Sequence, residues 1–292
     1  MNNWGLNNTY DYYEFAIDSL DNSGSGNGNV SALNWPSFYV GGKNPLTRVR
    51  GMKILSAEIP FSYYVFTTRN NKFEVSLNGL SGWVNITIPV GNYTKDTILP
   101  ILRDLIAGAL SLPTITVTFN PTTMKLEFFG PFFFRFIEDV LASPRLWLGF
   151  NAGVFGGVTF SAPNVALMSG PNYLYINSTQ FGQLTNNYLP TGDSSTNGNT
   201  GAQIAKVPVN CDSGEIIYYK DPDPQKYFDI GDSNSIQKID FYLSVGTSED
   251  VLDLNGLSFS LKLALLLEKM NMDESRSGLM GQDRVVKRMR PY

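Results

Sequence analysis

The sequence predicts a mainly β fold, a β-sandwich or jelly roll that carries a small α+β insertion. Short segments of β-forming residues recur along the chain with turn sequences between them, while only one long segment has the apolar spacing of a strong helix. With 292 residues, the chain is long enough to bury a substantial core. The two ends are polar or basic, and they are predicted to be extended arms outside this core.

Residues 1–45 are predicted to form a flexible N-terminal arm, because the run DNSGSGNGNVSALN is too polar and too rich in glycine to bury a core. An aromatic patch lies at the distal end of this arm, and its members are Trp4, Tyr10, Tyr12, Tyr13 and Phe15. Such a patch is unfavourable in water, so these residues are candidates for docking onto a neighbouring subunit. The alternative that the patch packs back on its own domain stays open.

The β-rich core is predicted at residues 46–268. Its first clear strand covers residues 54–59 and stops at Pro60, which has no backbone N–H for a ladder. After an aromatic cluster, Asn70 and Asn71 favour a turn into a returning strand at residues 72–77. Later strands are expected at residues 174–177, 204–209, 215–220, 227–230, 236–245 and 257–267.

The α+β insertion is predicted at about residues 83–150. Its helix covers residues 95–110, with Thr94 as the N-cap and apolar residues at helical spacing. Pro100 lies inside this helix and predicts an irregular first turn. Strands are expected around the helix at residues 83–88, 114–119 and 124–129.

Three further segments have an unusual composition. Residues 131–136, PFFFRF, are the most aromatic run, and we expect them in the core or in a subunit interface rather than in a ligand platform. Residues 151–157 are rich in glycine but lack the pattern of a phosphate-binding loop, so these glycines are expected in turns and bulges. Residues 184–203 form a long polar segment, which predicts an exposed, mobile tip or a functional loop.

The composition excludes several classes of enzyme. The chain has no His and one Cys, Cys211, so a Ser-His-Asp triad, a His-based zinc site and an intrachain disulfide are impossible. Cys211 has no adjacent Lys or Arg that would lower its pKa, so a reactive thiolate is not expected. Residues 221–224, DPDP, are interpreted as a rigid loop rather than a catalytic pair, and the acidic residues at 229–250 lack EF-hand spacing. We therefore predict no enzymatic activity, no cofactor and no metal site.

Charged residues are scarce along the whole chain. They make up 16% of it, against about 25% in an average soluble domain. A surface so poor in charge suits a protein that is covered by its neighbours. The net charge of −4 gives no general argument for nucleic-acid binding.

Residues 269–292 are predicted to form a basic C-terminal tail, whose candidate binding residues are Arg284, Lys287, Arg288 and Arg290. A basic tail can bind nucleic acid or an acidic protein surface, and a solvated terminus is the alternative. At the other end, the N-terminus has neither a basic region nor an apolar run, so no signal peptide is expected. No segment reaches the length of a membrane-spanning helix.

Several short motifs follow one another in a distinctive order. The main ones are IPFSYY at residues 59–64, GNYT at residues 91–94 before the helix, and DLNGLSF at residues 253–259. TFNPTTMKLEFF, LWLGF, PNYLYINS, KVPV, GEIIYY and IQKIDFYL lie between the last two. Over roughly residues 48–268, this order resembles that of penton and minor capsid proteins of virophages, Polinton-like viruses and related DNA viruses of the double-jelly-roll lineage.

The resemblance implies a single jelly roll, a homo-pentamer at the five-fold vertices of an icosahedral capsid, and no enzymatic activity. The roughly 220 residues between arm and tail are also too few for sixteen strands of roughly 5–6 residues with their connections. The implied partners are major capsid proteins, contacted through the arms, and other minor capsid proteins or a vertex spike. The implied location is the virion, assembled inside the host cell.

Two other functions stay open. A carbohydrate- or receptor-binding β-sandwich would present an aromatic platform, to which Tyr173, Tyr175, Tyr218 and Tyr219 are possible contributors. A glycoside hydrolase on the same fold would need two carboxylates on facing strands, roughly 5–10 Å apart, and no predicted strand offers such a pair.

Overall fold

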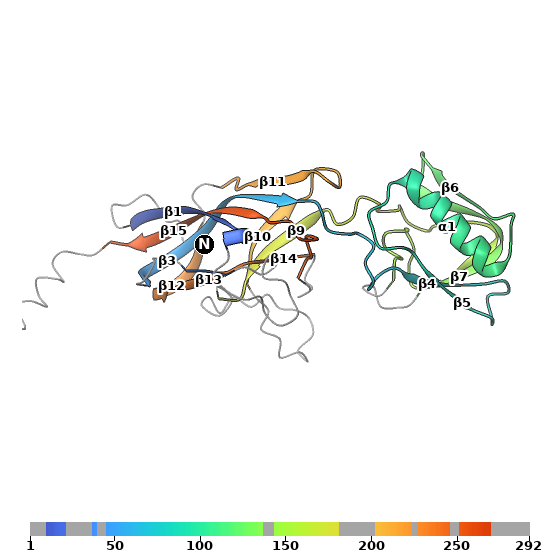
Figure 1. Cartoon of the computed structure of the whole chain (residues 1–292), viewed down its shortest axis with the longest axis horizontal. Coiled ribbons are helices and arrows are strands. Elements are labelled where there is room, and N and C mark those ends of the chain that lie inside the picture. The colour runs from blue at the N-terminus through green and yellow to red at the C-terminus, as the bar shows by residue number, and fades with distance from the viewer. Residues whose placement is uncertain are drawn as a thin grey trace, which may run out of the picture.

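The computed structural model describes residues 10–21, 37–39, 45–136, 143–180, 202–223, 227–245 and 251–269. The chain forms two bodies, a β-sandwich with both ends of the described chain and a second body that contains the helix (Figure 1). The second body, which we call the insertion, is built from the chain between two strands of the sandwich, β3 and β9.

The first sheet of the sandwich is arranged around its longest strand, β3 (Leu46–Pro60). On one side, β3 pairs with β15 (Ser260–Glu268), which in turn pairs with β1 (Tyr10–Asp18). On the other side, β3 pairs with both β11 (Ile216–Lys220) and β12 (Phe228–Ile236). All of these pairings are antiparallel.

The second sheet consists of two separately hydrogen-bonded parts, β2 (Ser37–Tyr39) with β13 (Lys238–Asp240), and β14 (Tyr242–Ser244) with β9 (Tyr173–Ser178) and β10 (Ala202–Pro208). β2 pairs with β13, and β9 pairs with β14 and β10. β13 and β14 are separated by one residue and act as one strand.

The strand order of the two sheets is that of a jelly roll. Treating β11 with β12 and β13 with β14 as single strands, and numbering along the chain, one sheet has the order 1-8-3-6 and the other 2-7-4-5. The predicted mainly β fold with a single jelly roll is therefore confirmed.

The insertion has its own antiparallel sheet and a helix, as predicted. In its sheet, β5 (Val84–Thr87) pairs with β4 (Lys72–Ser76). β4 and β6 (Thr116–Asn120) pair with one edge of β7 (Lys125–Phe136), at residues 133–135 and 125–129, and β8 (Gly153–Ser161) pairs with the other edge. This sheet begins before, and ends after, the expected range of 83–150, because β4 and β8 belong to it.

The helix α1 (Lys95–Leu110) has the predicted bounds, and local sequence explains its start. The Thr94 side chain accepts a hydrogen bond from the Thr97 N–H, and the Thr97 hydroxyl accepts one from the Thr94 N–H, which forms a capping box. The helix continues across Pro100. Its buried residues, Ile98, Leu102 and Ile106, form the stripe that packs in the core of the insertion.

The structure corrects the predicted boundary of the N-terminal arm. Residues 10–18 form β1, which pairs with β15 over nine residues, and η1 (Ser19–Asp21) follows it. The physical reason is the alternation of β1, which directs Phe15 and Ile17 onto the core of the sandwich.

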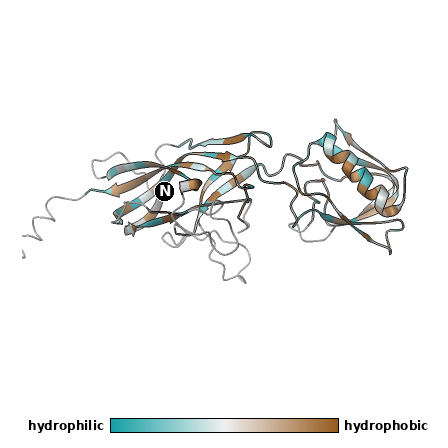
Figure 2. Cartoon of the chain, in the orientation of Figure 1, coloured by the Kyte–Doolittle hydropathy of each residue, from teal (hydrophilic) through white to brown (hydrophobic). Residues whose placement is uncertain are grey.

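Aromatic side chains fill the core of the insertion. Phe132, Phe134 and Phe136 of the PFFFRF run are buried, and Phe134 lies 4.7 Å from Phe128 between ring centres. The structure therefore supports the prediction that this run lies in the core. Figure 2 shows the corresponding alternation of hydrophobic and hydrophilic residues along the strands and around the helix.

The glycines of segment 151–157 were expected in turns and bulges, but residues 153–157 lie in β8, whose register with β7 shifts once, between Phe129 and Phe132. A Cβ atom at Gly156 would lie 2.5 Å from the carbonyl oxygen of Phe132 and 2.5 Å from Cδ1 of Phe133. The ring of Phe133 also lies against Gly79, where a Cβ would be 2.9 Å away. Glycine is therefore required in this strand by close packing, a reason that local sequence does not reveal.

Replacing Gly156 by Ala is expected to lower the free energy of unfolding by about 1–3 kcal/mol, because the new methyl group would collide with backbone atoms of β7. Gly108→Ala is the matched control. Gly108 is an exposed helical residue with open space around it, so this change should raise stability by about 0.5–1 kcal/mol. Urea unfolding of both variants checks the difference, and equal midpoints would contradict the packing argument.

Candidate interaction surfaces

Two of the motifs behind the sequence resemblance meet where β3 leaves the sandwich. Asn255 and Gly256 have φ values of 53° and 82°, and the Leu257 N–H donates to the Leu254 carbonyl at 3.1 Å, which closes a tight turn. This turn holds the chain just after β3. The Ser62 hydroxyl donates to the Leu254 carbonyl at 2.6 Å, and the Asn255 side-chain amide donates to the Ser62 carbonyl.

The third motif supplies Asn92, which binds the same segment from the insertion. Its Oδ1 accepts from the Val65 N–H at 2.7 Å, and its Nδ2 donates to the Tyr63 carbonyl at 2.9 Å. Nδ2 also lies 2.6 Å from the hydroxyl oxygen of Ser213, in the loop between β10 and β11. Asn92 therefore connects the insertion to the sandwich.

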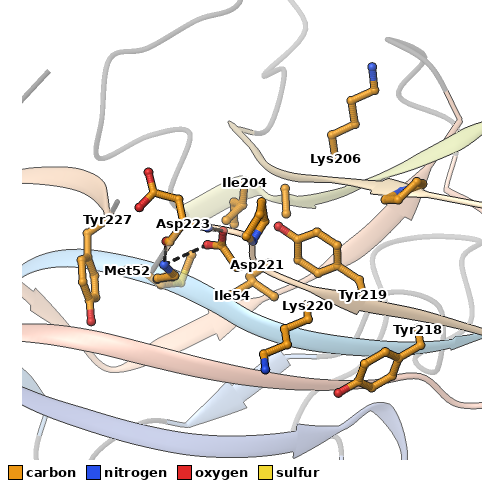
Figure 3. Close-up of a pocket in the computed structure, with 14 residues that line it drawn as sticks. Met52, Ile54, Ile204, Lys206, Tyr218, Tyr219, Lys220, Asp221, Asp223 and Tyr227 are labelled. Carbon is orange, nitrogen blue, oxygen red and sulfur yellow. Dashed lines mark hydrogen bonds and ion pairs between the residues drawn. The ribbon is translucent and has the colours of Figure 1, made fainter. Parts of the chain in front are cut away.

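A buried ion pair holds the loop after β11. Lys53 is 4% exposed, and its Nζ lies 3.1 Å from Oδ2 of Asp221 and donates to the Asp223 carbonyl (Figure 3). The ammonium also lies 5.8 Å from the centre of the Tyr227 ring. On the backbone, the Asp221 N–H donates to the Leu55 carbonyl at 3.0 Å. These contacts support the interpretation of DPDP as a loop, whereas sequence reasoning did not find Lys53.

A cavity of about 720 Å³ lies beside this ion pair, between β3, β10 and β11. Met52, Ile54 and Ile204 contribute apolar side chains to it, and Tyr219 lines it as well (Figure 3). Burial, and then the nearby Asp221 carboxylate, raise the pKa of the Tyr219 phenol above its usual value. Among the described residues that line the cavity, the Asp221 carboxylate is already paired with Lys53.

The four candidate tyrosines do not form one platform. Tyr173 and Tyr175 alternate with fully buried residues of β9 and therefore face outward from the second sheet, with ring centres 5.5 Å apart. Tyr218 is 56% exposed, and both Tyr218 and Tyr219 contribute to the lining of the cavity. In addition, Lys206 Nζ lies 3.9 Å from the centre of the Tyr173 ring and occupies its face.

The aromatic docking candidates fall partly within β1. Tyr10, Tyr12, Tyr13 and Phe15 lie on this strand, whereas Trp4 and the side chain of Tyr12 lie outside the described residues. Phe15 packs against the core, and Tyr13 is 43% exposed with its ring centre 5.6 Å from that of Phe15. Docking of this patch onto a neighbour stays a prediction.

Most of the remaining candidate residues lie outside the described part of the chain. The basic-tail residues Arg284, Lys287, Arg288 and Arg290 lie outside it, as do residues 184–201 of the polar segment 184–203. Within the described ranges, no group of three His, Cys, Asp or Glu residues comes together to hold a metal ion. No helix in these ranges has the length and apolar character that a membrane crossing requires.

The only cysteine lies in an unreactive setting. Burial raises the pKa of the Cys211 thiol, and the carboxylates of Glu215 and Asp212 raise it further. The thiol therefore stays protonated at neutral pH. This agrees with the expectation from its sequence neighbours.

No protein-family model matches the chain, and no curated protein sequence matches it. Among solved structures, the chain is similar to the mavirus penton protein, with 11% identity, 89% of this chain and 99% of that chain covered, and a TM-score of 0.48. It is also similar to a chain in the structure of the Sputnik virophage, with 12% identity, 90% and 99% covered, and a TM-score of 0.43. These identities are too low to transfer the role of any residue.

Replacing Asn92 by Ala is expected to lower the free energy of unfolding by about 1–3 kcal/mol, because the Val65 N–H and the Tyr63 carbonyl lose their partner. Asn151→Ala serves as the control, since Asn151 is exposed and makes one side-chain contact, with Asn164. This control should change stability by less than about 0.5 kcal/mol. Urea unfolding measures both, and an effect of Asn92→Ala no larger than that of the control would refute the bridging role.

Asp221→Asn is expected to destabilise the protein by about 3 kcal/mol, because it leaves the buried ammonium of Lys53 without its charge partner. Glu14→Gln makes the same change in an exposed ion pair with Lys262 and should cost less than about 1 kcal/mol. Adding Lys53→Met to Asp221→Asn should restore part of the loss, because the unpaired charge is then gone. Thermal unfolding of these three variants and of the single variant Lys53→Met tests this, and additive effects in the double variant would count against a coupled pair.

Proposed function

We propose that the protein is a structural protein of a viral capsid, a penton that forms pentameric capsomers at the five-fold vertices of an icosahedral shell. The observation that carries the proposal is the jelly-roll strand order, interrupted after its third strand by a separate α+β body. The order of motifs along the sequence supports it, since that order resembles penton and minor capsid proteins over roughly residues 48–268.

The scarcity of charge also supports a protein that is covered by neighbours. A ring of five uses heterologous contacts, so every subunit hides two flanks. Neutral polar and aromatic residues are cheaper to bury in such contacts than unpaired charges. In this chain charged residues are 16% of the total, and aromatic residues are 13%.

The proposed partners are further copies of this chain and a major capsid protein, contacted through the two ends of the chain, with other minor capsid proteins or a vertex spike as additional partners. The proposed location is the virion, after assembly inside the host cell. We propose no enzymatic activity, in line with the engaged carboxylate of Asp221 and the absence of His from the sequence. The carbohydrate-binding alternative is less well supported, because Tyr218 and Tyr219, as successive residues of β11, point to opposite faces of that strand and Lys206 covers the ring of Tyr173.

Light scattering of the purified chain tests the proposal. At physiological salt and over a range of concentrations, we expect the mass of five copies of the 32.4 kDa chain. A dimer or trimer at every concentration would contradict the five-fold position. A monomer at every concentration, together with binding to immobilised glycans, would favour the carbohydrate-binding module instead.

A further inference from the structure

One edge of the insertion sheet lacks the protection that the edges of the sandwich have. Exposed edge strands are templates for pairing with another chain, and proteins usually block them with charges, prolines or short length. β1 carries Asp11 and Glu14, which form ion pairs with Lys269 and Lys262. Other edges carry a charge as well, such as Lys206 on β10 and Lys220 on β11.

β8 has none of these devices. Its nine residues, GVFGGVTFS, include no charge and no proline. It pairs with β7 on one side, and no strand among the described residues pairs with its other side. Val158 on this strand is 74% exposed, and Val154 is 51% exposed. Among the described edge strands, it alone is longer than five residues and free of charge.

The backbone of β8 presents hydrogen-bonding groups along this free edge. The Ala162 N–H donates to the Leu126 carbonyl at 2.8 Å, which fixes the alternation of bonded and outward-facing residues. Ser161 and Thr159 are therefore the positions whose N–H and C=O groups point away from β7. Both residues are exposed.

The opposite edge of the same sheet, β5, offers a matching set of groups. Its four residues, VNIT, carry no charge. The Ile88 N–H donates to the Asn71 carbonyl at 2.9 Å, so the same alternation directs the backbone groups of Thr87 and Asn85 outward. These two residues are exposed as well.

The directions of the strands allow the two edges to pair between copies. β8, β7, β4 and β5 are each antiparallel to the next, so β8 and β5 run in opposite directions at the two edges. A rotation about an axis close to the strand direction preserves these directions. The β5 strand of a neighbouring copy would then meet β8 as an antiparallel partner.

We propose that the insertions of adjacent copies join through β8 of one copy and β5 of the next, which continues the sheet around the ring. The occupant of the β8 edge is thus a second copy of this chain. The contact is heterologous, because it joins two different edges, and it can close into a ring only when every copy offers both. This inference rests on the proposed pentamer, and it assigns part of the pentamer's contact to backbone pairing between insertions.

Cysteine cross-linking in the full-length chain tests the proposal. In a Cys211→Ser background, Thr159→Cys and Asn85→Cys place one thiol on each edge, and a short bismaleimide joins thiols on adjacent copies. We expect a ladder of covalent products on denaturing gels that ends at five copies. The matched control pairs Asn85→Cys with Val165→Cys, which is 53% exposed and lies outside every strand, and it should give no ladder.

The alternative outcomes separate this inference from the proposed function. Efficient dimers from Thr159→Cys alone would overturn the inference, because they indicate a two-fold β8–β8 contact. A pentameric mass by light scattering with no cross-links would also overturn it, while leaving the proposed penton in place. A monomeric mass with no cross-links would count against both.

A charge on the edge provides a second test. Val158→Lys should weaken the pentamer, because a lysine on an edge strand opposes the addition of another strand. The protein concentration at which half of the chains are in pentamers should rise at least about tenfold. Val165→Lys adds the same charge away from the edge and should leave assembly unchanged. Equal assembly of the two variants would overturn the inference.

Discussion

The jelly roll depends on the pairing of β3 along both of its edges. β15 covers one edge, and on the other edge β12 pairs with residues 46–52 while β11 pairs with residues 56–60. Between these two partners, the loop after β11 fills the gap through the Asp221 N–H and through the ion pair with Lys53. A buried ammonium is tolerated there because its carboxylate partner and a carbonyl oxygen surround it. The contacts of Asp221 with Leu55 and Lys53 thus complete the edge of β3, the central strand of the first sheet.

Backbone groups that lack a strand partner also explain the motifs at the junction between the sandwich and the insertion. Pro60 ends β3, and the chain then leaves the sheet, so the backbone groups of residues 62–65 have no ladder to join. Asn255 and Asn92 supply the missing partners from the sandwich and from the insertion. These motifs are rich in Asn, Ser and Gly because such residues bind backbone groups or form tight turns. They position the insertion against the sandwich.

Features that depend on neighbouring residues could be predicted from the sequence, and features that depend on distant ones could not. The bounds of α1 follow from the cap at Thr94 and the apolar stripe, both of which lie within the helix or beside it. β1 was missed because a glycine-rich run follows it and because its pairing partner, β15, lies at the far end of the described chain. The contact between Lys53 and Asp223 joins residues 170 positions apart, and the strand order of the jelly roll rests on pairings of similar range.

The placement of the few charges connects the composition to the proposed assembly. Arg50 pairs with Glu268, Lys53 with Asp221, Glu14 with Lys262 and Arg135 with Glu74, so many of these charges are neutralised within the chain. Three of these pairs lie in the sandwich, where charged side chains also protect the edge strands from backbone pairing. The insertion instead has neutral edges, the nine-residue β8 and the four-residue β5. The two bodies therefore suit different kinds of contact, side chains on the faces of the sandwich and backbone groups at the edges of the insertion.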